Sequence, residues 1–326
     1  MADASPYRTS LHRLSDPAVR PAWDRLLAQS AQATAYADLR FAARVEAALG
    51  LPAFVASVWE DDVLRAGALV FEKRRGPYRA AALPPLVQYV SPLLDGDLRE
   101  TDVHHHRSPL DALLGLIAGT FHQATLVLHP SLGDVRPFQW QGWRVEPAFT
   151  YRIDLQAQDA VTSGWSSNPK RTLKRERDDF VLADGAQYVA EALALVEASH
   201  ARQGQSLGIA SESAAALAHG LAEDGLVRAF VARRDGTAEA GLLVLSDGRT
   251  AHYWLAGSEP GAAMTVLLGH VLPRLREEGV ATFDFVGANT PSIAEFKRRF
   301  GSALVPYFRA RHTARPELRL LDRLRR

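Results

Sequence analysis

Acidic, amide and basic side chains follow one another between residues 281 and 308, at Asp284, Asn289 and Lys297. A carboxylate buried away from water has a raised pKa, which would suit Asp284 to accept a proton in a reaction. Each residue also has a purely structural interpretation. Asp284 would bond a neighbouring backbone amide, Asn289 would form a turn, and Lys297 would lie on a solvated helix face.

A strand, a loop and a short helix must position these side chains. Residues 282–286 are aromatic or β-branched, which predicts a buried strand that ends at Gly287. Thr290 and Pro291 predict the start of a helix. Gly301 follows its end. The helix has one apolar face, made of Ile293, Phe296 and Phe300.

Other segments carry residues that could bind anions or transfer protons. Four cations are spaced so that they lie along one side of a predicted helix, which would suit phosphate binding. Alternatively, the four would form a solvated face paired with Glu176 and Asp178. Tyr253 would protonate a leaving group or pack in the core. The C-terminal tail is a second basic segment with the same two interpretations. The four cations are Lys170, Arg171, Lys174 and Arg175.

Composition limits the function classes. The 326 residues carry a net charge of +1, which gives no overall attraction to nucleic acid or membranes, and DNA is not expected as a partner. The absence of cysteine excludes disulfides, thiolate metal sites and a cysteine nucleophile. His104, His105 and His106 have no carboxylate at ligand spacing, so no metal site is expected. No apolar stretch reaches bilayer length, and we expect a cytoplasmic protein without a transmembrane segment.

Both halves of the chain show one order of elements: helices, antiparallel strands, a helix and a strand. In the second half, strands are predicted at 227–233, 240–246 and 250–256, followed by a long helix that ends at Glu278. The chain changes character after Gln156. We therefore predict two α/β domains, 1–158 and 159–326, with the tail 309–326 as a segment that could cross back to the first.

Four segments resemble the GNAT-type N-acyltransferases, in the branch that contains the Fem-type peptidoglycan aminoacyltransferases. Residues 279–287 resemble the pattern G-x-x-x-x-D-F-x-G, and residues 293–301 resemble I-x-x-F-K-x-x-F-G. The basic helix 170–177 resembles the helix that opens the second domain of that branch. Residues 240–244 and 251–254 resemble its central hairpin.

The resemblance implies two tandem GNAT-like domains, each a mixed, mostly antiparallel sheet flanked by helices, with the acyl donor in the second. Phe296 and Lys297 would then lie by the reacting carbonyl, where Lys297 would stabilise the oxyanion. Asp284, or a water that it orders, would take the amine proton. Tyr253 is a further catalytic candidate, and Asn289 a substrate-binding one.

The resemblance also implies a donor loop before the long helix, where backbone N–H groups bind pyrophosphate. The segment lacks the Arg or Gln that usually leads this loop, and Glu259 would repel phosphate. The corresponding residues here are Gly257, Ser258, Gly261 and Ala262.

These features together predict an N-acyltransferase that moves an acyl group from acyl-CoA to an amine on a small molecule or peptide, by direct attack and without a permanently bound cofactor. One alternative is a Fem-like aminoacyltransferase that uses aminoacyl-tRNA and acts on a cell-wall precursor or peptide. Another is a non-catalytic binding protein on a degenerate transferase fold.

Overall fold

A computed structural model describes residues 6–95, 108–157 and 161–314. The chain forms two compact units, one made of residues 1–147 with 307–326 and the other of residues 148–306. The sequence placed its boundary at residue 158. The chain returns to unit 1 at Tyr307, and the tail beyond residue 314 lies outside the described residues.

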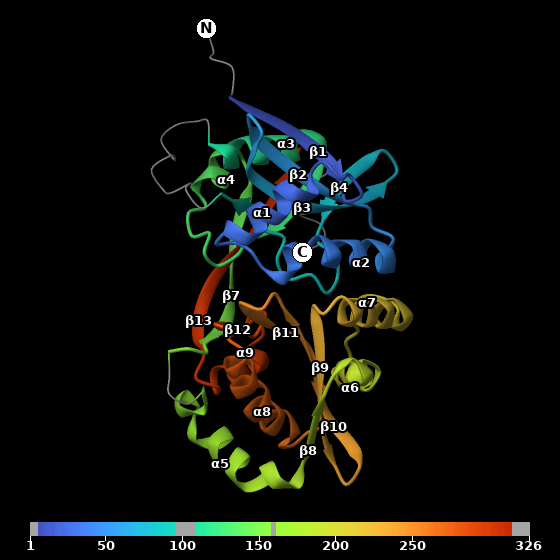
Figure 1. Cartoon of the computed structure of the whole chain (residues 1–326), viewed down its shortest axis with the longest axis vertical. Coiled ribbons are helices and arrows are strands. Elements are labelled where there is room, and N and C mark those ends of the chain that lie inside the picture. The colour runs from blue at the N-terminus through green and yellow to red at the C-terminus, as the bar shows by residue number, and fades with distance from the viewer. Residues whose placement is uncertain (1–5, 96–107, 158–160, 315–326) are drawn as a thin grey trace. The chain divides into compact units, whose positions relative to one another are not determined.

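Unit 1 contains a mixed sheet flanked by helices (Figure 1). Neighbouring strands are antiparallel except for the parallel pair β4 and β6. The strands, in spatial order, are β1 (Tyr7–Arg13), β2 (Ala53–Glu60), β3 (Val63–Arg75), β4 (Tyr78–Ala82), β6 (Gln123–Val127) and β13 (Ala303–Thr313), and β5 (Leu93–Leu94) pairs with β3. The helices are α1 (Arg20–Gln29), α2 (Leu39–Leu49), α3 (Pro109–Thr120) and α4 (Arg136–Trp140).

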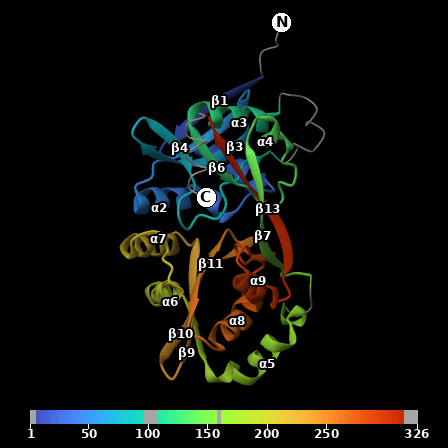
Figure 2. The ribbon, with the colours of Figure 1, turned by 180° about the vertical axis from the view of Figure 1, so that it is seen from behind.

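Unit 2 repeats this arrangement, with helices on both faces of a sheet. Helices α6 and α7 lie on one face and α8 on the other, as the two opposite views show (Figures 1 and 2). Strands β11 and β12 are parallel, and the other neighbours are antiparallel. The strands, in order, are β7 (Arg144–Asp154), β12 (Thr282–Asp284), β11 (Thr250–Ser258), β10 (Thr237–Ser246), β9 (Val227–Arg234) and β8 (Val181–Asp184). Residues 144–147 of β7 belong to unit 1. The helices are α5 (Ser167–Glu176), α6 (Val189–Arg202), α7 (Ser211–Glu223), α8 (Ala263–Glu277) and α9 (Pro291–Arg298). The predicted α/β class with mixed, mostly antiparallel sheets is therefore confirmed.

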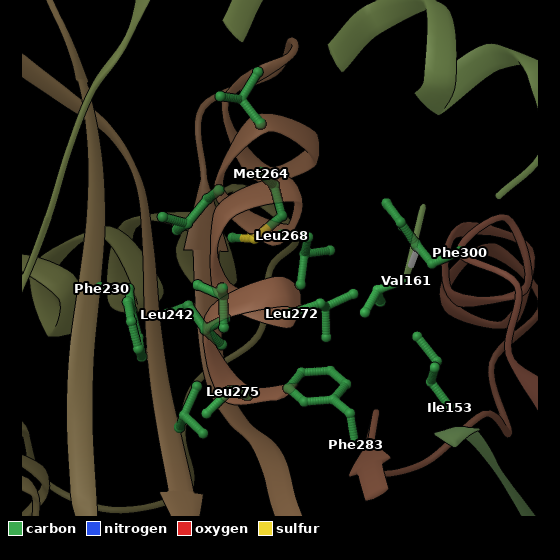
Figure 3. Packing of buried hydrophobic residues seen from close by; sticks show 14 of the residues in the cluster. Ile153, Val161, Phe230, Leu242, Met264, Leu268, Leu272, Leu275, Phe283 and Phe300 are labelled. Atoms are coloured by element: carbon green, nitrogen blue, oxygen red, sulfur yellow. The ribbon is translucent and has the colours of Figure 1, made fainter. Parts of the chain in front are cut away.

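Helix α8 forms the centre of the unit 2 core (Figure 3). Its buried residues Met264, Leu268, Leu272 and Leu275 recur at helical spacing and belong to the same core cluster as Phe283. Burying a side chain of this size stabilises a fold by about 1.5–3 kcal/mol. This packing fixes β11 and β12, the strands that lead into the candidate site.

Some local predictions differ from the structure. Strands β4 and β8 were not predicted, because their alternation of polar and apolar residues is weak. Strand β12 ends at Asp284 rather than Val286, since Val286 adopts a left-handed φ of 54° that ends the extended backbone.

Candidate functional site

Asp284 lies fully buried at the end of β12, and three donors bind its carboxylate. Thr150 Oγ1 and the Val286 N–H donate to Oδ1 at 2.6 and 2.8 Å, and Arg152 Nε donates to Oδ2 at 2.8 Å. Burial alone would raise the pKa of Asp284, but Arg152, His252 and these hydrogen bonds together lower it. The expectation of a raised pKa is wrong, and the structural interpretation of Asp284 fits this geometry.

Lys297 is 6% exposed and points inward from α9, unlike the exposed Arg298 and the partly exposed Arg299. Its Nζ donates to three backbone carbonyls, those of Phe285 at 2.6 Å, Val286 at 2.8 Å and Gly287 at 2.7 Å. An ammonium group has three hydrogens, so these bonds engage all of them. Contact with an oxyanion would require one carbonyl to be given up.

Burial lowers the pKa of Lys297 to about 8, and the nearby Asp284 carboxylate opposes this shift. The three carbonyl oxygens also favour the charged form. Lys297 is therefore an ammonium at neutral pH. The interpretation of Lys297 as part of a solvated helix face is wrong.

Asp284 and Lys297 hold one residue between them. Val286 is β-branched and has a φ of 54°, a conformation that costs a non-glycine residue about 1–3 kcal/mol. Its N–H donates to Asp284 and its carbonyl accepts from Lys297. We call residues 285–287, with these two side chains, the clamped loop. Such strain persists only where the surroundings impose it, and here two buried charges do so.

Asn289 and Phe296 lie beside the clamped loop. The Asn289 side chain accepts from the Phe149 N–H at 2.9 Å and donates to the Phe149 carbonyl at 3.4 Å, so it binds β7 as a neighbouring strand would. These contacts give Asn289 a structural role. Phe296 packs against Phe300 with ring centroids 4.9 Å apart and stays partly exposed.

Tyr253 joins the same cluster from β11. The Lys297 Nζ lies 5.6 Å from the centre of its ring, and the ring of Phe285 lies 5.6 Å away. Burial raises the pKa of the Tyr253 phenol, so the hydroxyl stays protonated. The structure thus brings Asp284, Lys297 and Tyr253 together.

Strand β11 changes partners beside this cluster. It pairs with β12 only from Thr250 to His252, whereas its pairing with β10 continues to Ser258. Among the described residues, no strand pairs with the β12-side edge of β11 beyond His252. The register with β10 also shifts beside Trp254, a β-bulge that re-aims backbone groups. An extended ligand with amide groups could add to this edge as a strand does.

The predicted donor loop leads from β11 into α8. Gly261 has a φ of 145° with open space around it, and Ala262 begins α8 without a side-chain cap. Glu259 pairs with Arg202 at 2.7 Å, and this guanidinium also donates to the Ser258 carbonyl. The negative charge expected to repel phosphate is therefore balanced by a cation from α6.

Gly257 has a packing role that the sequence did not reveal. A Cβ at this position would lie 2.3 Å from the Leu195 carbonyl oxygen and 2.5 Å from the Val196 Cα, both backbone atoms of α6. The absence of a side chain lets α6 approach β11. Close helix packing therefore explains this glycine without a bound pyrophosphate.

The cations of α5 have different surroundings. Lys170 donates to the Ser163 carbonyl, and Arg175 pairs with Glu176. Arg171 and Lys174 are exposed and have no ion pair with a carboxylate of the described residues. Among the described residues, none of the hydrogen bonds or ion pairs of Lys170 and Arg175 reaches the clamped loop.

The polar partners of Asp284 were not predicted. Thr150, Arg152 and His252 come from β7 and β11, which flank β12. Burial lowers the pKa of His252 to about 4, against the opposing effect of Asp284, so the imidazole is neutral. The alternation of polar and apolar residues in 150–155 is the sequence pattern that could have indicated polar side chains of β7 beside Asp284.

The described part of the chain has neither a cluster of metal ligands nor a membrane-spanning helix. No three His, Asp or Glu side chains there are placed to hold a metal ion, and residues 104–106 lie outside it. No helix in that part is long and apolar enough to cross a bilayer.

Comparisons with known proteins identify the architecture. Residues 167–298 match the family model of the acetyltransferase (GNAT) domain. A structure of FemX is 12% identical with a TM-score of 0.67, covering 88% of this chain and 95% of that one. A tandem GNAT protein from the clavulanic acid biosynthesis pathway is 16% identical with a TM-score of 0.57, covering 95% and 99%.

A third structure is the C-terminal domain of a putative lysylphosphatidylglycerol synthetase from Agrobacterium fabrum. It is 16% identical with a TM-score of 0.57, covering 94% of this chain and 96% of that one. No curated protein matches the sequence. At these identities the solved structures show a shared fold, which is the predicted tandem of GNAT-like domains.

Proposed function

We propose that this protein, a member of the GNAT superfamily with a Fem-like tandem fold, transfers an acyl group from a coenzyme A thioester to an amine. The observation that carries the proposal is the edge of β11 that β12 leaves open, next to a bulge and to the uncapped start of α8. An acyl-pantetheine arm carries two amides and a thioester and is followed by phosphates. Amides would bind the strand edge, and phosphates would bind the N–H groups of α8.

In the reaction, the amine nitrogen attacks the thioester carbonyl, a C–N bond forms, and the C–S bond breaks. Backbone N–H groups at the bulge of β11 would stabilise the oxyanion, because the hydrogens of Lys297 are already engaged. The protonated Tyr253 would donate to the departing thiolate. The amine proton would pass to water, which would return a proton to the Tyr253 phenolate, since Thr150, Arg152 and Val286 occupy the Asp284 carboxylate.

One observation favours a second candidate, an aminoacyl-tRNA donor. Arg171 and Lys174 project from α5 without carboxylate partners among the described residues, as cations that meet a phosphate backbone would. The leaving group would then be a ribose hydroxyl instead of a thiol. The same amine attack and the same oxyanion contacts would serve this donor.

Calorimetry with acetyl-CoA and with charged tRNA, together with an assay for released thiol on a panel of amines, tests the proposal. We expect acetyl-CoA to bind and to release thiol when an amine is present. Thr265→Glu places a negative charge in the first turn of α8 and should weaken acetyl-CoA binding by about tenfold. Thr265→Gln, its uncharged match, should change binding little.

Other results of these assays would support the alternative functions. Binding and turnover of charged tRNA without binding of acetyl-CoA would establish the aminoacyl-tRNA donor. Binding of neither donor, with no turnover, would leave a non-catalytic binding protein. Equal effects of Thr265→Glu and Thr265→Gln on acetyl-CoA would remove α8 from the donor site.

A further inference from the structure

Unit 1 contains a basic pocket of about 730 Å³, a volume typical of small-ligand sites. It lies where the parallel strands β4 and β6 begin and where β13 ends, and every residue that lines it belongs to unit 1. No aspartate or glutamate is among the lining residues. Its cations are Lys73, Arg75, Arg79, Arg144 and Arg311.

Strand register explains the shape of this basic pocket. Lys73 and Arg75 lie opposite Ala80 and Tyr78 on β4, so these residues share one face of the sheet. The same face continues through β6 to Arg311 on β13, which lies opposite Thr125. Ala80 and Thr125 are small and partly exposed, and they leave room above the sheet. Three interstrand steps separate the cations of β3 from Arg311, about 14 Å, which a ligand of nucleotide size can span.

The cations of the basic pocket fall into two groups. Arg79 binds the buried carboxylate of Glu72, and Arg144 pairs with Glu146, so these two have local counterions. Lys73, Arg75 and Arg311 are exposed and have no ion pair with a carboxylate in the part of the chain that the structure describes. Three such cations on one concave face make a strongly positive potential, which an anion would relieve.

His122 adds a donor of fixed orientation. Its Nδ1 accepts a hydrogen bond from the Arg79 backbone N–H at 3.1 Å, so the neutral ring carries its proton on Nε2. The edge of the ring also contacts Tyr78, with centroids 5.5 Å apart, which holds the imidazole in place. His122 lines the basic pocket and thus offers it an N–H group.

We propose that the basic pocket binds a small phosphorylated ligand, with Lys73, Arg75 and Arg311 contacting phosphate oxygens and His122 donating a further hydrogen bond. Arginine and lysine side chains bind phosphate by charge-assisted hydrogen bonds. The concave shape favours a compact ligand over a nucleic-acid backbone, which follows open basic surfaces. The residues that line this pocket lie in unit 1, whereas β11 and α8, the proposed acyl-transfer elements, lie in unit 2.

Calorimetry on the full-length protein with inorganic pyrophosphate tests the site, at low and at high salt. The double variant Arg75→Gln/Arg311→Gln should weaken binding by about a hundredfold, since each charge-assisted contact contributes about tenfold. Arg25→Gln is the matched control, an exposed arginine of α1 outside the pocket. Thermal melting of each variant verifies folding, and the single variant Lys73→Gln gives an independent reading if the double variant does not fold.

Three results would overturn the proposal. The first is absence of pyrophosphate binding to the wild-type protein. The second is an equal loss of binding in Arg25→Gln and in the pocket variants, or no loss in the pocket variants, which would place the anion elsewhere, for example at α8. The third is binding of a single-stranded RNA oligomer that depends on Arg75 and Arg311 while pyrophosphate fails to compete, which would indicate a nucleic-acid surface.

Discussion

Substitution of Lys297 by methionine distinguishes a role in the clamped loop from a role in catalysis. Methionine keeps the apolar stem but removes the three hydrogen bonds to the carbonyls of Phe285, Val286 and Gly287. Each bond of a charged group contributes about 1.5–3 kcal/mol. Relief of ammonium burial and of the strain at Val286 offsets part of this sum, and we expect a net loss of about 2–4 kcal/mol.

Chemical denaturation and amide exchange measure this loss. The unfolding free energy should fall by that amount, and the melting temperature of unit 2 by about 5–15 °C. The amides of Val286 and Ala288, which bond Asp284 and Phe149, should exchange at least about ten times faster. Arg298→Met is the control, because the exposed ion pair of Arg298 with Glu295 contributes at most about 1 kcal/mol.

The result that refutes the clamp is equally specific. If Lys297→Met keeps wild-type stability and wild-type exchange at residues 285–288 while kcat falls by a hundredfold or more, Lys297 acts on the reacting carbonyl. If stability, exchange and activity are all lost together, Lys297 positions the loop.

Three further predictions concern unit 2. From pH 7 to about pH 4.5, the unfolding free energy of the wild type should fall by about 2–3 kcal/mol more than that of His252→Gln. Burial lowers the pKa of His252 to about 4, so only the unfolded state takes up the proton in this range. Urea titrations measure both free energies, and an equal fall in the two proteins would contradict the prediction. Gly257→Ala should lower the unfolding free energy, measured by thermal melting, by about 2–4 kcal/mol, because the new Cβ meets the backbone of α6. Gly115→Ala on α3 is the control; its Cβ has open space, so the unfolding free energy should stay the same or rise. Asp284→Asn should lower stability by about 2–4 kcal/mol and leave the pH dependence of kcat/KM unchanged in shape; loss of an acidic limb would instead make Asp284 a general base.

Local patterns in the sequence were enough to predict most elements of unit 2. The three strands predicted between residues 227 and 256 are β9, β10 and β11, and the long helix predicted to end at Glu278 is α8, which ends at Glu277. These segments have strong periodicity and are ended by glycine turns, so tertiary contacts have little to override. Edge strands such as β8 carry polar and small residues, and β8 forms a strand because it pairs with β9, which its own local sequence does not indicate.

The candidate site was less predictable, because its contacts join distant residues. Lys297 stands in a Lys-Arg-Arg run typical of an exposed helix face, yet it is the one of the three that is buried. Only the order β7, β12, β11 brings Arg152 and His252 to Asp284, and 132 residues separate Arg152 from that carboxylate along the chain. The left-handed φ of Val286 results from these side chains, since a valine alone favours a strand.

The division of the chain has a consequence for biosynthesis. Unit 1 is completed by residues 309–313 of β13, which pair with β6, and the whole of unit 2 is translated between the first 147 residues and this part of β13. At about 5–20 residues per second, a ribosome takes roughly 10–30 s to cover this interval. During that time the nascent first unit has an open edge on β6, whereas unit 2 is continuous and can fold when its last residue emerges. We therefore expect misfolding or chaperone binding to begin at the open edge of β6 in unit 1, although unit 1 is synthesised first.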